Sequence, residues 1–232
     1  FRDMAKEAIE QLFRQGKIPV ISGGTGLYVN SLIYDMDFSA PPGDGTRRQE
    51  LYELAEKEGS DAVHAILKQE DPEAAARIHP NNLKKVVRAI ESAESGCKVP
   101  SFSQSFHPTA DYEVLLVGLT RERGELYDRI NQRVDLMIEE GLVEEVRGLL
   151  QMGLTEEDIS MKGIGYKELI SYFSGNCSME DAILKMKQNT RHLAKRQLTW
   201  FRRYPELQWF SVSDYPDDES CIEEIISWLK KQ

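Results

Sequence analysis

The sequence predicts an α/β fold with a parallel sheet, interrupted by an all-helical insertion. Two apolar runs, residues 17–22 and 112–120, have the composition of strands, and a third strand is expected at 207–212. The run at 112–120 is almost uninterrupted, as in a buried parallel sheet. Paired glycines and a helical pattern follow the first run, which is the strand, turn and helix order of an α/β unit.

Helical patterns account for most of the remaining chain. The expected helices cover residues 1–17, 25–33, 46–58, 60–69, 71–77, 82–95, 125–141, 142–152, a segment after 166, 179–203 and 219–231. Ser60 is expected to cap one helix, and Asp71 is expected to cap the next because Pro72 suits the first helical position.

Turn-rich segments divide this pattern into a core and an insertion. The segment "APPGDG", residues 40–45, opens a string of helices that "GCKVPSFSQSFHP", residues 96–108, closes. We therefore expect a first part of the core at 1–40, a helical insertion domain at 41–106, and a second part of the core with the C-terminal helices at 107–232.

Composition narrows the class of protein. The 232 residues include 29 Lys and Arg against 39 Asp and Glu, a net charge of −10 that disfavours non-specific adhesion to nucleic acid. The three cysteines are far apart, without metal-ligand spacing, so we expect reduced thiols, no structural zinc and a cytoplasmic location. No apolar run reaches the ~18–20 residues of a membrane span. Because Phe1 falls in a helical pattern already under way, we expect a further segment upstream.

A basic segment near the end of the chain opposes this acidic background. Residues 185–203 contain seven Lys and Arg and no Asp or Glu. On a helix, Met186, Leu193 and Trp200 share an apolar face. The opposite face carries the cations Arg191, Lys195 and Arg202, with Lys187 at its edge. This face fits either a solvated helix that pairs with acidic surroundings or a seat for a phosphate backbone. Trp200 and Phe201 are expected in the core rather than as base-stacking platforms.

A glycine-rich turn, "SGGTGLY" at residues 22–28, separates the first strand from its helix. Backbone N–H groups at such a turn can face an anion, although a tight turn without a ligand explains the glycines equally well. The turn is not a Walker A loop, because GxxxxGK[ST] does not occur in the chain, and it does not match GxGxxG.

Five segments in this order resemble the bacterial tRNA dimethylallyltransferases, also called tRNA isopentenyltransferases. They are "ISGGTGLYVNSLI", "ARIHPNNLKKVVRAIE", "INQRVDLMIEEGLVEEV", "MKGIGYKEL" and "RHLAKRQLTWFRRY". The resemblance extends over essentially the whole chain. It implies a P-loop-type α/β core with a helical insertion, and transfer of a dimethylallyl group from dimethylallyl diphosphate to the exocyclic N6 amine of the adenosine 3′ of the anticodon.

The resemblance also implies the partners and what lies outside these residues. We expect binding of an anticodon stem-loop and of dimethylallyl diphosphate, Mg²⁺ as cofactor, a monomer, and no membrane association. The P-loop and the general-base aspartate of the family are expected upstream of Phe1. If the 232 residues were the entire polypeptide, we would therefore expect no turnover.

The site residues are carried over from the same resemblance. Arg133 matches the catalytic arginine that acts on the allylic diphosphate. The tRNA-binding residues would be Thr25, Arg47, Lys84, Lys85, Arg88, Lys162, Gly163, Gly165, Tyr166, Lys167, Lys195, Arg196, Gln197, Trp200 and Arg202. The substrate channel would include Gly23, Gly24, Gly26 and Tyr28.

Other interpretations of these residues stay open. By pattern alone, Arg133 is an ordinary helix-surface arginine, and Val86, Val87 and Ile90 could simply turn inward from an amphipathic helix with solvated lysines. "KGIGYKEL" could be only a glycine-containing helix start. Two competing functions are a P-loop kinase of a small molecule and a non-catalytic tRNA-binding module.

Overall fold

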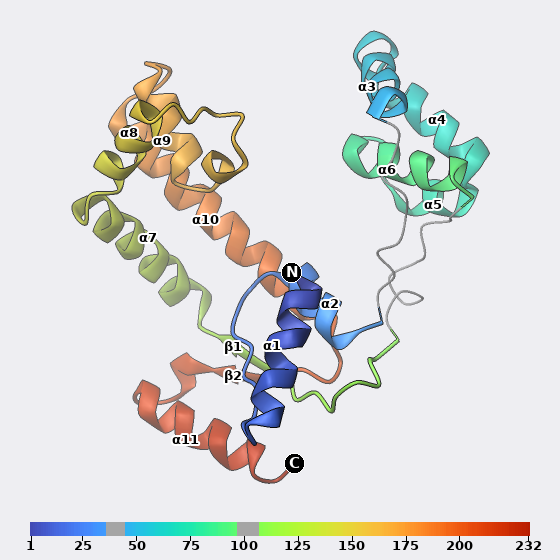
Figure 1. Ribbon diagram of the computed structural model, residues 1–232. Helices are drawn as coiled ribbons and strands as arrows, with labels where there is room; N and C mark the ends of the chain where they lie inside the picture. Colours follow the sequence, from blue (N-terminus) through green and yellow to red (C-terminus); the bar gives the residue numbers. More distant parts are fainter. Residues whose placement is uncertain (36–44, 97–106) are drawn as a thin grey trace. The chain divides into compact units, whose positions relative to one another are not determined.

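A computed structural model of the chain describes residues 1–35, 45–96 and 107–232 (Figure 1). The chain separates into two compact units. The first comprises Phe1–Gly23 and Leu27–Tyr112, and the second comprises Gly24–Gly26 and Glu113–Gln232. The segments expected to open and close the insertion lie mostly outside the described residues, so the domain boundaries stay a prediction.

The helices of the first unit follow the predicted string closely. They are α1 (Arg2–Arg14), α2 (Gly26–Ile33), α3 (Gly45–Glu58), α4 (Ser60–Glu70), α5 (Pro72–Arg77) and α6 (Leu83–Glu94). Asp71 caps α5 as predicted, since its side chain accepts a hydrogen bond from Ala74 N at 2.9 Å. The prediction that Ser60 caps α4 is wrong, because Gly59 holds that position and Ser60 is already helical.

Helices α3 to α6 enclose an apolar core. Leu51, Val63, Leu67, Val86 and Ile90 are almost completely buried in it. Burying one such side chain contributes roughly 1.5–3 kcal/mol, so this small bundle has a substantial driving force for folding. The inward orientation expected for the apolar residues of α6 is therefore confirmed.

The prediction of a strand at residues 17–22 is wrong. These residues have no regular secondary structure, and Ile18 and Val20 are each 87% exposed. An apolar run with high β propensity becomes a strand only when another strand offers its backbone groups, because propensity mainly reflects packing on a sheet. Among the described residues, no backbone hydrogen bond joins Ile18–Ile21 to another segment.

The second unit contains a two-stranded parallel sheet, which confirms the predicted direction of pairing. Strand β1 (Val117–Thr120) lies beside β2 (Gln208–Ser211), with Val117 opposite Gln208. Phe210 is buried and meets Trp228 of α11 (Asp218–Leu229) edge-on, with 6.1 Å between ring centroids.

The prediction that the run at 112–120 is buried is wrong. Only its last four residues form a strand, and Leu119 is 59% exposed. A parallel sheet buries both faces when several strands and covering helices surround it. In the described sheet each of the two strands is an edge strand, so β1 lacks the neighbours that would cover it.

The remaining helices of the second unit form a bundle. They are α7 (Arg123–Glu139), α8 (Leu142–Gln151), the 3₁₀ turn η2 (Ile159–Lys162), α9 (Tyr166–Phe173) and α10 (Met179–Phe201); a second 3₁₀ turn, η3 (Val212–Asp214), follows β2. Figure 1 shows α7 alongside the long α10, with α8 and α9 packed at one end of both. Val134, Val146, Leu169 and Met186 are buried in the shared core.

Candidate functional site

Arg133 projects from α7 at the edge of a cavity. Its side chain is 63% exposed, and its Nη1 lies 3.7 Å from Glu140 Oε2. An exposed ion pair of this length contributes little, so the guanidinium donors are accessible to a ligand. The next residue, Val134, is only 3% exposed and anchors this turn of α7 in the core. The helix therefore holds the arginine at a fixed position on the surface.

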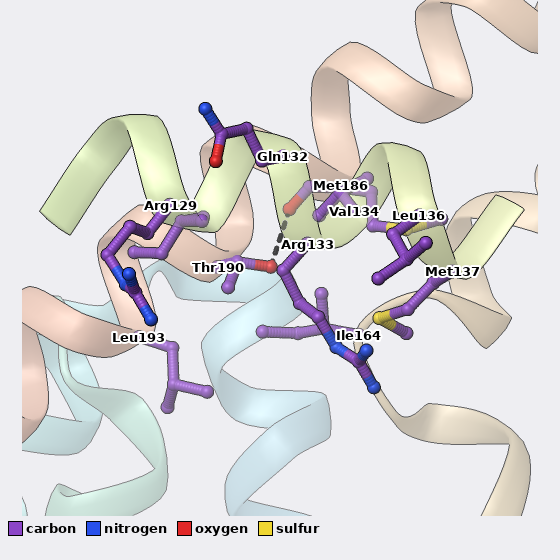
Figure 2. A pocket seen from close by; sticks show the side chains of 11 residues that line it. Arg129, Gln132, Arg133, Val134, Leu136, Met137, Ile164, Met186, Thr190 and Leu193 are labelled. Carbon is purple, nitrogen blue, oxygen red and sulfur yellow. Dashed lines mark hydrogen bonds between the residues drawn. The ribbon is translucent and has the colours of Figure 1, made fainter. Parts of the chain in front are cut away.

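The cavity beside Arg133 has a volume of about 660 Å³ and lies between α7, α10 and the segment before α9 (Figure 2). Arg129, Gln132 and Arg133 supply polar groups at its edge. Apolar side chains make most of its wall, including Met137, Ile164, Met186 and Leu193. This arrangement suits a ligand with one anionic and one apolar part.

The basic segment of α10 is divided between two environments. Lys195, Arg196 and Arg202 are exposed, and none of them forms an ion pair within the part of the chain described. Lys187, placed at the edge of the cationic face, and Arg191 contact α7 instead, and the ion pair of Lys187 is of the kind expected for a helix that pairs with acidic surroundings. Lys187 Nζ lies 2.6 Å from Asp135 Oδ1, and Arg191 Nη1 donates to Asn131 Oδ1 at 2.6 Å.

Tertiary packing provides these two partners. Asp135 and Asn131 belong to α7, which lies against α10, so the partners of Lys187 and Arg191 come from another helix. A helical pattern within residues 185–203 cannot show this. The apolar face is also less buried than predicted: Met186 is enclosed, whereas Leu193 is partly exposed at the cavity.

The glycine turn meets α10 at close range. Gln197 Nε2 donates to Gly24 O at 3.1 Å, and a Cβ added to Gly24 would lie 2.3 Å from that nitrogen. A Cβ on Gly26 would lie 2.1 Å from Trp200 Nε1. The rigid indole of Trp200 requires glycine at position 26, whereas the flexible amide of Gln197 could move away from a Cβ at position 24. These contacts also bring four of the predicted site residues together, with Trp200 half-buried.

The other site residues predicted around this turn do not share these contacts with α10. Thr25 is exposed. A Cβ added to Gly23 would meet nothing within 4 Å. The ring of Tyr28 stacks on Phe1 with 4.2 Å between centroids. The proposal that Gly23 and Tyr28 line a substrate channel stays a prediction.

The segment "KGIGYK" connects η2 to α9 through specific backbone and side-chain contacts. Gly165 has φ +101°, a conformation that favours glycine, and its N–H donates to Glu168 Oε2 at 2.7 Å. Tyr166 donates its hydroxyl proton to Glu145 of α8. Lys162 and Lys167 are exposed at this segment. Gly163, also predicted here, is exposed and ends η2.

Sequence reasoning missed the buried residue on which this segment depends. Glu168 is 5% exposed and also accepts from Asn189 Nδ2 of α10 at 2.6 Å. The carboxylate thus links the start of α9 to α10. A glutamate at the third residue of a helix is a known capping signal, and its spacing from Gly165 could have identified it.

Within the insertion, Arg47 is engaged by carboxylates. Its Nη2 lies 2.7 Å from Glu94 Oε1, and its Nη1 lies 3.1 Å from Glu50 Oε2. The hydrogen bonds that Arg47 donates to Glu94 and then to Glu50 raise the pKa of Arg47. The contact with Glu94 joins α3 to α6, which sequence reasoning did not anticipate. A parallel pair joins Arg48 to Glu91 at 2.8 Å.

The exposed side of α6 carries the cations predicted there. Lys84, Lys85 and Arg88 are all exposed, opposite the buried valines. These three exposed cations of one helix can contact phosphates.

The described residues offer no ligand set for a metal ion. Within residues 1–35, 45–96 and 107–232, no group of three or more His, Cys, Asp or Glu side chains could hold one. The Mg²⁺ implied by the resemblance would not need such a group, because Mg²⁺ is usually held by one or two carboxylates together with substrate phosphates. No described helix is long and apolar enough to cross a bilayer.

Comparison with known proteins defines the class. A profile of the family described as IPP transferase matches residues 1–204. The tRNA dimethylallyltransferase of Alkaliphilus oremlandii is 51% identical over 231 residues, which are 99% of this chain and 74% of that protein. The corresponding enzyme of Clostridioides difficile is 44% identical, with 99% and 74% covered. The chain belongs to the IPP transferase family.

Solved structures agree with this assignment. The full-length tRNA isopentenylpyrophosphate transferase of Bacillus halodurans is 38% identical with a TM-score of 0.65, covering 100% of this chain and 75% of that one. A eukaryotic dimethylallyltransferase acting on tRNA is 26% identical with a TM-score of 0.72, covering 95% and 56%. The fold is thus the α/β fold with a helical insertion found in this family.

Proposed function

We propose that this protein transfers a dimethylallyl group from dimethylallyl diphosphate to the N6 amine of the adenosine 3′ of the anticodon in tRNA. The observation that supports this most strongly, together with family membership, is Arg133 at the edge of a largely apolar cavity in the second unit. Its fork of N–H donors suits a diphosphate, and the apolar wall suits a short isoprenoid chain.

The reaction forms one bond and breaks another. The N6 nitrogen attacks the allylic carbon, the carbon–oxygen bond breaks, and its electron pair leaves with the diphosphate. The proton of the amine passes to a carboxylate, which the resemblance assigns to an aspartate upstream of Phe1. Because negative charge grows on the departing diphosphate, Arg133 would stabilise the transition state more than the ground state.

The exposed cations would bind the tRNA. On α10, Lys195, Arg196 and Arg202 would contact phosphates of the anticodon stem-loop, while Gln197 and Trp200 would hold the glycine turn near Thr25. Lys162 and Lys167 would extend this surface within the second unit. In the insertion domain, proposed at 41–106, Lys84, Lys85 and Arg88 would serve the same role.

The target adenosine would leave the loop stack to reach the cavity. An unpaired loop base is extruded at a lower cost than a base in a duplex. Such a substrate is modified in the cytoplasm, and a monomer would suffice. The Mg²⁺ that the resemblance implies would help to neutralise the charge on the departing diphosphate.

A transfer assay tests the proposal. The protein with labelled dimethylallyl diphosphate and tRNA should yield labelled N6-dimethylallyladenosine at the position 3′ of the anticodon. Phosphorylation of a small molecule with ATP, without transfer to tRNA, would instead support a P-loop kinase. Binding of tRNA with affinity unaffected by dimethylallyl diphosphate, and no transfer, would support a binding module.

A further inference from the structure

Arg129 and Arg133 lie one turn apart on α7 and line the same cavity. Residues at positions i and i+4 share one face of a helix, and Figure 2 shows both side chains extending from α7 into the region of the cavity. Two like charges at this spacing repel each other on a helix. Arg133 has only a long, exposed ion pair with Glu140, so both guanidinium groups can bind an added anion.

The nearby Glu125 attracts Arg129 electrostatically but forms no direct ion pair with it. No ion pair or hydrogen bond of Arg129 is found within residues 1–35, 45–96 and 107–232. Glu125 lies one turn before it but is already engaged, because Ser213 Oγ donates to its Oε2 at 2.5 Å and Arg121 Nη1 lies 2.5 Å from its Oε1. Arg129 is exposed, so its guanidinium is accessible.

The rest of the cavity indicates what kind of anion fits. Beyond the two arginines and Gln132, its wall includes Met137, Ile164 and Leu193. A nucleic-acid phosphate backbone is polar and would not complement this apolar wall. A ligand with a diphosphate at one end and a short hydrocarbon chain at the other uses both parts.

We propose that Arg129 is a second diphosphate-binding residue, which holds the allylic donor together with Arg133. This inference rests on the proposed function and adds a residue to the donor site. Two guanidinium forks one turn apart can each bind one phosphate group of a diphosphate through charge-assisted hydrogen bonds. Leu193 contacts the hydrocarbon part of the same ligand.

The test measures donor kinetics in Arg129→Gln, with Arg147→Gln as the matched control. Arg147 is an exposed arginine of α8 that pairs with Glu144 and does not line the cavity. At saturating tRNA, Arg129→Gln should lower kcat/KM for dimethylallyl diphosphate about tenfold, the effect of losing one charged hydrogen bond. The dissociation constant for tRNA should stay unchanged, and Arg147→Gln should match the wild type.

A second pair of measurements distinguishes contacts with the diphosphate from contacts with the hydrocarbon chain. Inorganic diphosphate, used as an inhibitor, should bind Arg129→Gln more weakly than the wild type. Leu193→Ala should raise KM for dimethylallyl diphosphate but leave inhibition by inorganic diphosphate unchanged, because that inhibitor has no hydrocarbon chain.

The proposal is overturned if Arg129→Gln keeps the wild-type kinetics for dimethylallyl diphosphate. It is also overturned if this variant keeps those kinetics but binds tRNA more weakly and with a reduced salt dependence. Arg129→Lys, which keeps the charge but loses the fork, should recover only part of the donor kcat/KM. A wild-type protein without any transfer activity would refute the proposed function itself. Transfer by the wild type with unchanged Arg129→Gln kinetics would refute only this inference.

Discussion

Lys187 of α10 and Asp135 of α7 form a close ion pair, with 2.6 Å between Nζ and Oδ1. The lysine side chain is only 19% exposed, so its charge is partly withdrawn from solvent. This pair separates the cations of α10 into those that hold the bundle together and those that face outward.

We predict that the two kinds of cation differ in tRNA binding. Lys195→Gln should reduce the slope of log affinity against log salt by roughly 0.7–0.9, the contribution of one phosphate contact. Lys187→Gln should leave this slope unchanged and lower thermal stability instead. Filter binding or fluorescence titration at several salt concentrations measures the slope. Equal slopes for Lys195→Gln and the wild type would refute the proposed tRNA contact.

The glycine turn provides a stability prediction. Gly26→Ala would place a Cβ 2.1 Å from Trp200 Nε1, so we expect a loss of about 1–3 kcal/mol in the free energy of unfolding, typical of overpacking. Gly23→Ala is the matched control, because a Cβ there meets nothing within 4 Å. Chemical denaturation measures both variants. If Gly26→Ala were as stable as Gly23→Ala, the packing of the turn on α10 would be wrong.

The pH dependence of stability should involve Glu125. The hydrogen bond from Ser213, followed by that from Arg121, lowers the pKa of Glu125 below its ordinary value of 4.5. Its contribution is therefore present above the unfolded pKa and is lost as pH falls through the lower folded value. Glu125→Gln should flatten the fall in melting temperature below about pH 4.5.

Two comparisons test this assignment. Ser213→Ala should have the same direction of effect as Glu125→Gln, because it removes the main cause of the lowered pKa. Glu139→Gln, a change at an exposed carboxylate of the same helix, should keep the acid response of the wild type. An unchanged acid response in both Glu125→Gln and Ser213→Ala would contradict the assignment.

The sequence was sufficient to predict most helices, because the signals for a helix lie within the segment that forms it. The helices of the insertion have regular apolar spacing, and Asp71 before Pro72 marks one start unambiguously. The strand predicted at 17–22 failed because pairing depends on other segments, which a local pattern does not contain.

The candidate site could be predicted in part. Arg133 was identified by resemblance, and the structure adds the cavity at which it lies. The roles of Lys187 and Arg47 could not be predicted, because their carboxylate partners Asp135 and Glu94 come from other helices. Such partners become visible only when the helices are packed.

The kinetics of Arg133→Ala test the central claim most directly. With saturating dimethylallyl diphosphate and tRNA, kcat should fall about a hundredfold or more, as when one donor to a developing negative charge is removed. The dissociation constant for tRNA should be unchanged, and melting temperature should confirm that the exposed side chain is not needed for folding. An equal loss of turnover and tRNA affinity would show that Arg133 only seats the tRNA, and unchanged kcat would contradict the account.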